Sequence, residues 1–130
     1  MKAGKGYTCY TVKNRGEILT ALREQNLVKF PDIILHHVTW EFGVTQDGSI
    51  PDVTEARIVG IKSNDKIQAL VVNVNGSMIR PDGKTLHITL SLDKAAGAKP
   101  VHSNDLLSGS VGNLTKLDIP LELEPTFIPF

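Results

Sequence analysis

The order of hydrophobic and polar positions near the start of the chain predicts a strand followed by a helix. Residues 7–12 are mostly aromatic and β-branched, the residue types that strands favour. Asn14 then supplies a helix-capping side chain, with Glu17 three residues later and apolar residues at helical spacing over 17–27. A proline in the segment 30–32 disfavours helical geometry, so the helix is expected to have ended by this point.

From residue 33 onward the pattern is almost entirely that of strands. Extended segments are predicted at 33–43, 55–62, 67–74, 85–92 and 117–123. Turn-forming residues at 63–66 and 80–84 join three of these segments into a meander. A polar loop is expected after residue 92. We therefore predict an α+β fold with one clear helix and a largely antiparallel sheet.

Composition narrows the class of protein. A length of 130 residues supports one domain spanning 1–130. The 14 Lys and Arg balance the 14 Asp and Glu, which excludes the broad basic surface of a sequence-independent nucleic-acid binder. No apolar run approaches the length of about 20 residues that spans a bilayer, and the first six residues are too polar for a secretory signal. Cys9 is the single cysteine, which argues against a disulfide framework and favours a soluble protein of the reducing cytoplasm.

Two of the predicted strands carry the same pattern of histidine, apolar residue, threonine and apolar residue. His37 begins the first copy and His87 begins the second. Since side chains alternate faces along a strand, Thr39 shares a face with His37, and Thr89 shares a face with His87. Each strand would therefore bury an apolar row and present an imidazole beside a hydroxyl. Paired side by side, or facing each other across a cleft, the two strands would form a pocket with two imidazoles and two hydroxyls.

This set of groups suits cleavage of a phosphodiester without a metal. Imidazole titrates near neutral pH, so one histidine can accept a proton while the other donates one to the leaving oxygen. The hydroxyls of Thr39 and Thr89 can donate hydrogen bonds to the non-bridging phosphate oxygens. No cofactor is needed for this chemistry. A zinc site built from the histidines is a rival, but no HExxH helix or cysteine pair accompanies them.

At these residues the chain resembles the 2H phosphoesterase superfamily, which is named for two His-x-Thr/Ser motifs and includes the LigT-like RNA 2′,3′-cyclic phosphodiesterases. Both motifs match in full, Phe42 and Gly43 after the first motif also fit, and the resemblance covers about residues 7–92. It implies a compact bilobal fold with the two motif strands facing a groove, and no required metal. It also implies that His37 and His87 are the acid and base, in either order, and that the two threonines hold the phosphate.

One departure from the family concerns the second lobe. Related proteins place a second helix there, whereas the stretch between Gly43 and His87 has strand and turn signals but no amphipathic helix. We therefore expect a reduced second lobe. This leaves the substrate open among cyclic phosphate ends of RNA, small cyclic nucleotides and 2′–5′ linked oligonucleotides.

Several further residues are weighed as candidates for contact with the substrate. Tyr7 and Tyr10 point to opposite faces of the first strand, so at most one can stack on a nucleobase. Lys99 and His102 lie in the loop 97–104, which directly follows the second motif strand and could border the pocket, although loop residues are usually only solvated. By the same alternation His36 is expected to point away from the pocket. Trp40 falls on the apolar row and is assigned to the core.

The function predicted from these residues is hydrolysis of a 2′,3′-cyclic phosphate, at an RNA or nucleotide end, to a 2′-phosphate. One alternative keeps the chemistry and changes the substrate to a cyclic or 2′–5′ linked signalling oligonucleotide. Another keeps the pocket and loses the chemistry, which would give a non-catalytic nucleotide-binding module. The expected partners are an RNA end or a small nucleotide, with no membrane and no obligatory protein partner.

Overall fold

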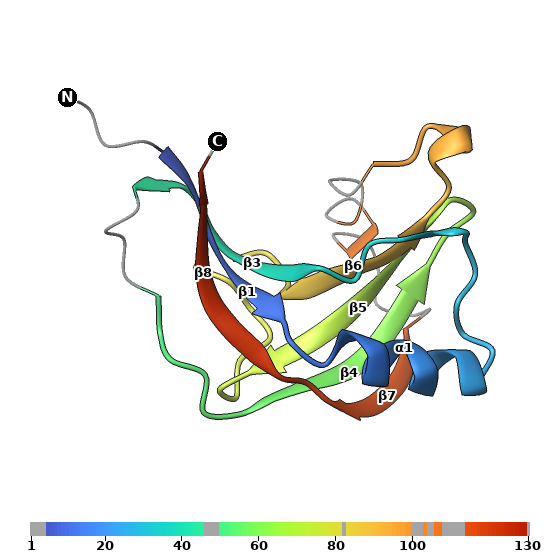
Figure 1. The fold of residues 1–130 in the computed structure, drawn as a ribbon, viewed down its shortest axis with the longest axis horizontal. Helices are drawn as coiled ribbons and strands as arrows, with labels where there is room; N and C mark the ends of the chain where they lie inside the picture. The colour runs from blue at the N-terminus through green and yellow to red at the C-terminus, as the bar shows by residue number, and fades with distance from the viewer. Residues whose placement is uncertain are drawn as a thin grey trace.

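The computed structural model describes residues 5–45, 50–81, 83–99, 103, 106–107 and 114–129, and its strands form one curved sheet (Figure 1). The helices whose bounds are described are the α-helix α1 (Arg15–Glu24) and the 3-10 helix η1 (Lys94–Ala96). The strands are β1 (Lys5–Val12), β2 (Asp32–Ile33), β3 (His37–Thr45), β4 (Ala56–Ser63), β5 (Ile67–Val74), β6 (His87–Leu92), β7 (Thr115–Pro120) and β8 (Leu123–Pro129).

The sheet has the strand order β7-β4-β5-β6-β3-β1-β8, and β2 pairs with β6 beside this path. All of the described strand pairs are antiparallel. The predicted α+β class, with a mostly antiparallel sheet and α1 as its clear helix, is confirmed, as is the meander of β4, β5 and β6. In the described part of the chain no helix is both long enough and apolar enough to span a membrane.

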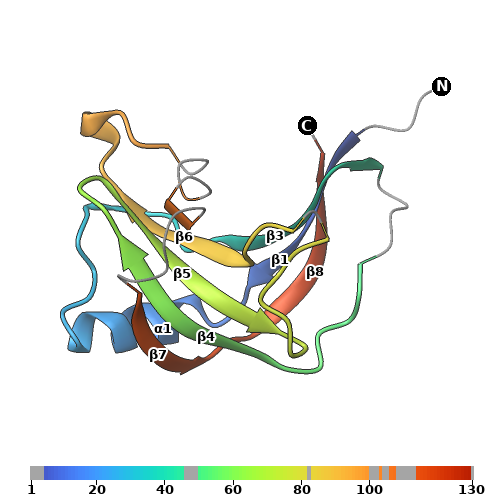
Figure 2. The same ribbon diagram turned by 180° about the vertical axis from the view of Figure 1, so that it is seen from behind.

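In the middle of the sheet, β3 and β6 meet along a narrow seam, that is, over very few paired residues. β3 pairs with β1 over seven registered residues, but it meets β6 in register only at Val38 and Ile88 among the described residues. The sheet therefore consists of one group of strands around β3 and β1 and another around β6 and β5. Figures 1 and 2 show the result: β1 and β8 rise at one end, the segment after β6 rises at the other, and β3 and β6 lie between them.

Two corrections concern the ends of predicted elements. The helix ends at Glu24 and not near residue 27, because Asn26 adopts a left-handed conformation with φ of 57°. The single strand predicted at 117–123 is in fact two strands, β7 and β8, which lie on opposite edges of the sheet. Pro125 and Pro129 lie in β8, at an edge of the sheet, where a residue without an N–H group is tolerated.

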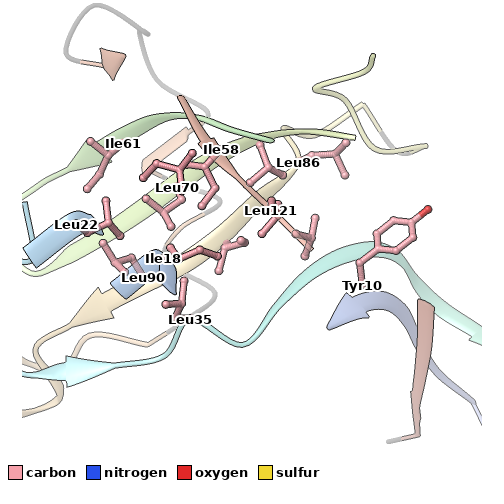
Figure 3. Close-up of a cluster of buried hydrophobic side chains, with 14 of the residues drawn as sticks. Tyr10, Ile18, Leu22, Leu35, Ile58, Ile61, Leu70, Leu86, Leu90 and Leu121 are labelled. Atoms are coloured by element: carbon pink, nitrogen blue, oxygen red, sulfur yellow. The ribbon is translucent and has the colours of Figure 1, made fainter. Parts of the chain in front are cut away.

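The core lies on the face of the sheet that α1 covers. Ile18 and Leu22 from the helix are fully buried and pack with Leu70, Leu90 and other strand residues (Figure 3). Val38 and Ile88, the middle residues of the two His-x-Thr patterns, belong to the same cluster and are also fully buried. The side chains that flank them in sequence therefore project from the opposite face of the sheet.

Asn14 connects the start of α1 to the chain between β7 and β8. Its Nδ2 donates to the Pro120 carbonyl (2.9 Å) and to the Glu17 carboxylate (3.1 Å), and its Oδ1 accepts from the Glu122 N–H (2.9 Å). The residue occupies the predicted N-cap position but makes no side-chain capping bond to the helix backbone. Its side chain instead fixes the turn that carries the chain from one sheet edge to the other.

We expect Asn14→Ala to lower the free energy of unfolding by about 1 to 3 kcal/mol, because the Pro120 carbonyl and the Glu122 N–H lose two part-buried hydrogen bonds together. Urea denaturation monitored by circular dichroism measures this change. Gln25→Ala is the control, since the Gln25 side chain makes only an exposed hydrogen bond to the Ala21 carbonyl (3.3 Å). Equal losses for the two variants would contradict the role given to Asn14.

Candidate active site

The two His-x-Thr patterns lie side by side on adjacent strands. Val38 in β3 is the register partner of Ile88 in β6, so the middle residues of the two patterns pair with each other. Because the strands are antiparallel, the two patterns run past this pair in opposite directions. Of the two arrangements that the sequence left open, the structure shows direct pairing on one face of the sheet.

His87 is held by the backbone of its own strand end. Its Nδ1 lies 2.8 Å from the carbonyl oxygen of Thr85, and since a carbonyl can only accept, the ring carries its proton on Nδ1. Burial lowers the pKa of His87; the bond to Thr85 opposes this shift, and the charges of Arg80 and Lys84 add to it. The neutral ring therefore presents an unprotonated Nε2 as its remaining nitrogen.

His37 has the more strongly shifted pKa of the two. Burial first, and then the charges of His36 and His87, lower its pKa from 6.5 to about 4. The contribution of His87 to this shift fits its place on the adjacent strand. At neutral pH His37 is uncharged and can accept a proton.

His36 does not point away from His37, contrary to the prediction from strand alternation. Its Nδ1 lies 2.8 Å from the Nδ1 of His37, and the ring centroids are 5.0 Å apart at an interplanar angle of 84°. Alternation fails here because Leu35, with φ of 41°, turns the chain just before β3 begins. His36 therefore joins the site, and no feature of the local sequence marked this left-handed turn.

The two threonines differ in their surroundings. Thr89 is 9% exposed, and its hydroxyl lies 2.8 Å from the hydroxyl of Ser103, which is fully buried. Thr39 is only half-buried. Ser103 belongs to the segment that was expected to border the pocket, but it was not singled out as a site residue. A loop hydroxyl at no fixed spacing from the motif carries no signal that would have identified it.

Tyr7 and Tyr10 lie on opposite faces of β1, as strand alternation requires. Tyr10 is fully buried, donates a hydrogen bond to the Pro51 carbonyl (2.9 Å) and packs edge-on against Trp40, which confirms Trp40 as part of the apolar face. The Tyr7 ring lies 5.4 Å from the His37 ring, so Tyr7 is the tyrosine beside the candidate site. Burial, followed by the effect of Cys9, raises the pKa of Tyr7, so its hydroxyl stays protonated at neutral pH.

Cys9 lies beside Thr39 on the neighbouring strand. Cys9 is the register partner of Thr39 in β1 and is fully buried, and burial raises its pKa to about 11. The thiol therefore stays protonated at neutral pH, the state of a small packing residue and not that of a nucleophile.

Positive charge gathers near the second motif although the whole chain is neutral. Arg80 and Lys84 come from the turn before β6, and their charges act on His87. Lys62 of β4 is 6% exposed and lies in the same cross-strand row as Ala69 and Thr89, which places it on their face of the sheet. Three cationic side chains therefore lie on or near the part of the sheet that carries the second motif.

The roles of Lys99 and His102 at the site stay predictions. Lys99 is exposed and lies shortly after η1. His102 lies outside the described residues.

An open pocket of about 350 Å³ lies elsewhere, lined by residues that include Lys13, Thr54 and Leu121. We place the candidate site at the paired motifs because they carry the histidines, whereas the titratable side chains that line the pocket are those of Lys13, Glu55 and Glu122. The described residues hold no cluster of three or more His, Cys, Asp or Glu side chains that could bind a metal.

Comparison of the chain with known protein families, with curated proteins and with solved structures finds no match in any of the three. The chemical interpretation of the site therefore depends on the geometry of its own residues.

Proposed function

We propose that the protein is a metal-independent phosphodiesterase of the 2H type, which hydrolyses a 2′,3′-cyclic phosphate at an RNA or nucleotide end to a 2′-phosphate. The observation that carries this proposal is the register of Val38 with Ile88. It puts two imidazoles and two hydroxyls on one face of two adjacent strands. The narrow seam between β3 and β6 supports a bilobal arrangement with one motif from each half.

In the proposed reaction His37 acts as the base and His87 as the acid. The lowered pKa of His37 keeps it ready to take a proton from water, whose oxygen attacks the phosphorus. The bond from phosphorus to O3′ then breaks, and protonated His87 gives its proton to O3′. The hydrogen bond to the Thr85 carbonyl stabilises the protonated ring of His87, which is why we assign it this role.

Thr39 and Thr89 would hold the non-bridging oxygens of the phosphate. The hydroxyl of Ser103 lies 2.8 Å from that of Thr89 and would orient the Thr89 side chain. Tyr7, beside His37, is placed to contact the nucleoside next to the phosphate. Arg80 and Lys84 would contribute attraction for the phosphate charge.

The test is a panel of substrates incubated with the purified protein in EDTA: 2′,3′-cyclic mononucleotides, RNA with a cyclic phosphate end, 2′–5′ oligoadenylate and cyclic dinucleotides. Chromatography that separates 2′- from 3′-phosphates identifies the product. Formation of a 2′-phosphate in EDTA is the expected result. Turnover of only the last two substrates favours a signalling oligonucleotide, and tight binding without product favours a binding module. Activity that EDTA abolishes would contradict a metal-independent mechanism.

The threonines give a separate prediction. We expect Thr39→Val and Thr89→Val each to lower turnover about 10²-fold, the usual cost of one hydrogen-bond donor to a developing negative charge. Only Thr89→Val should also reduce the free energy of unfolding, by about 1 to 3 kcal/mol, because it leaves the buried Ser103 hydroxyl without this partner. Steady-state kinetics and urea denaturation of both variants measure the two effects. Unchanged turnover in both would remove the threonines from phosphate binding.

A further inference from the structure

The contact between His36 and His37 has no counterpart at the second histidine of the site. The Nδ1 of His87 faces a carbonyl, which can only accept a hydrogen bond. The Nδ1 of His37 faces another imidazole nitrogen at 2.8 Å, and an imidazole can either donate or accept. The proton between His36 and His37 therefore has two possible positions, and these positions have opposite consequences for Nε2 of His37.

The chain holds His36 firmly in this place. The carbonyl of His36 accepts from the Val12 N–H in β1 (2.9 Å), and the preceding residue, Leu35, donates its N–H to the Thr89 carbonyl in β6 (2.9 Å). Leu35 is fully buried and carries the unusual left-handed φ of 41°. Backbone strain at a non-glycine residue costs about 1 to 3 kcal/mol and persists only where the surrounding structure enforces it. The strained turn brings an exposed ring against His37.

We propose that His36 is a positioning residue that accepts the Nδ1 proton of His37 and so fixes the tautomer in which Nε2 of His37 is free to act as a base. This inference rests on the role of His37 in the proposed function. If His36 were the donor, the neutral His37 ring would carry its proton on Nε2 and could not accept one there. With His36 as acceptor, both histidines of the site use Nδ1 for orientation and present Nε2 to the substrate.

The other groups around His37 cannot fix its tautomer through the same atom. Tyr7 contacts the ring of His37 at a centroid distance of 5.4 Å with the planes tilted by 39°, and His87 acts on it through charge. Among the described contacts, only His36 lies within hydrogen-bond distance of Nδ1. The tautomer therefore depends on a residue that is itself on the surface and is accessible to substitution without loss of core packing.

The experiment is ¹⁵N NMR of the histidine side chains at pH 7, in the wild type and in His36→Ala and His36→Asn. In the wild type we expect His37 to be protonated at Nδ1 and bare at Nε2. His36→Ala should move His37 toward the Nε2-protonated form, while His36→Asn, whose side-chain oxygen can accept the same hydrogen bond, should restore the wild-type pattern. His87 serves as an internal control, and its tautomer should stay constant in all three proteins.

Kinetics of the same variants provide the second readout. Loss of an orienting partner should lower kcat on the order of 10- to 100-fold in His36→Ala with KM little changed, and His36→Asn should recover most of it. The inference would be overturned if His37 were protonated at Nε2 in the wild type. It would also be overturned if the ¹⁵N chemical shifts of the His37 ring were the same in His36→Ala as in the wild type. The NMR result does not require turnover, so it decides the role of His36 even if the substrate panel yields no product and the proposed function fails.

Discussion

His37→Ala and His87→Ala are each expected to lower kcat/KM for a 2′,3′-cyclic nucleotide by about 10²- to 10⁴-fold, the usual contribution of a positioned acid or base. The double variant should be little worse than the poorer single variant, because the two groups act on one proton transfer sequence and their effects do not add. Lys116→Ala is a suitable control, since Lys116 is exposed on the edge strand β7. Thermal unfolding of all four proteins checks that the fold is retained.

A second substrate separates the two histidines. A phosphodiester with a p-nitrophenolate leaving group needs no proton on departure, so loss of the acid matters little for it. We expect His87→Ala to retain near wild-type activity toward such a substrate, while His37→Ala stays impaired. The reverse pattern would exchange the two roles, and full activity of either variant toward the cyclic nucleotide would remove that residue from the mechanism.

The elements of this fold that depend on local sequence were predictable. The helix began at the predicted cap, and the turns at 63–66 and 80–84 join the strands that were expected to pair. In the second turn Gly83 takes the left-handed conformation, with φ of 87°, that glycine makes inexpensive. The end of the helix was misplaced because apolar spacing continues beyond Glu24, whereas the chain turns at Asn26.

The pairing of distant strands was less predictable. Sequence showed that each motif strand has an apolar and a polar face, but not that Val38 and Ile88 are partners, because register between strands so far apart in sequence depends on tertiary packing. For the same reason the sequence did not predict that β7 and β8 lie on opposite edges of the sheet. Asn14, which holds the crossing between them, was interpreted only as a helix cap.

The histidine at position 36 illustrates the limit of pattern-based prediction at the site. Period-two alternation correctly placed His37 opposite to Val38, but it was extended one residue too far, into a segment where Leu35 is not in the strand conformation. Left-handed residues other than glycine and asparagine leave almost no trace in sequence. The contact between His36 and His37 is therefore visible only in the structure.

The dependence of kcat/KM on pH is expected to have an acidic optimum. The productive free enzyme needs His37 neutral and His87 protonated. His37, with a pKa of about 4, is neutral above that pH, whereas the pKa of His87 is lowered from 6.5. Below about pH 4 His37 becomes protonated and activity falls. As pH rises through and beyond the lowered pKa of His87, the acid loses its proton and kcat/KM falls tenfold per unit.

Binding of an anionic phosphate should raise the pKa of both rings, so the profile of kcat should lie at higher pH than that of kcat/KM. Lys84→Gln provides a matched test of the alkaline limb, because the charge of Lys84 lowers the pKa of His87. Its removal should move the alkaline limb of kcat/KM to higher pH, and Lys116→Gln should leave the limb in place. Initial rates from pH 3.5 to 9 give these profiles for the wild type, Lys84→Gln and Lys116→Gln. A flat profile between pH 5 and 9, or a limb that Lys84→Gln does not move, would contradict His87 as the proton donor.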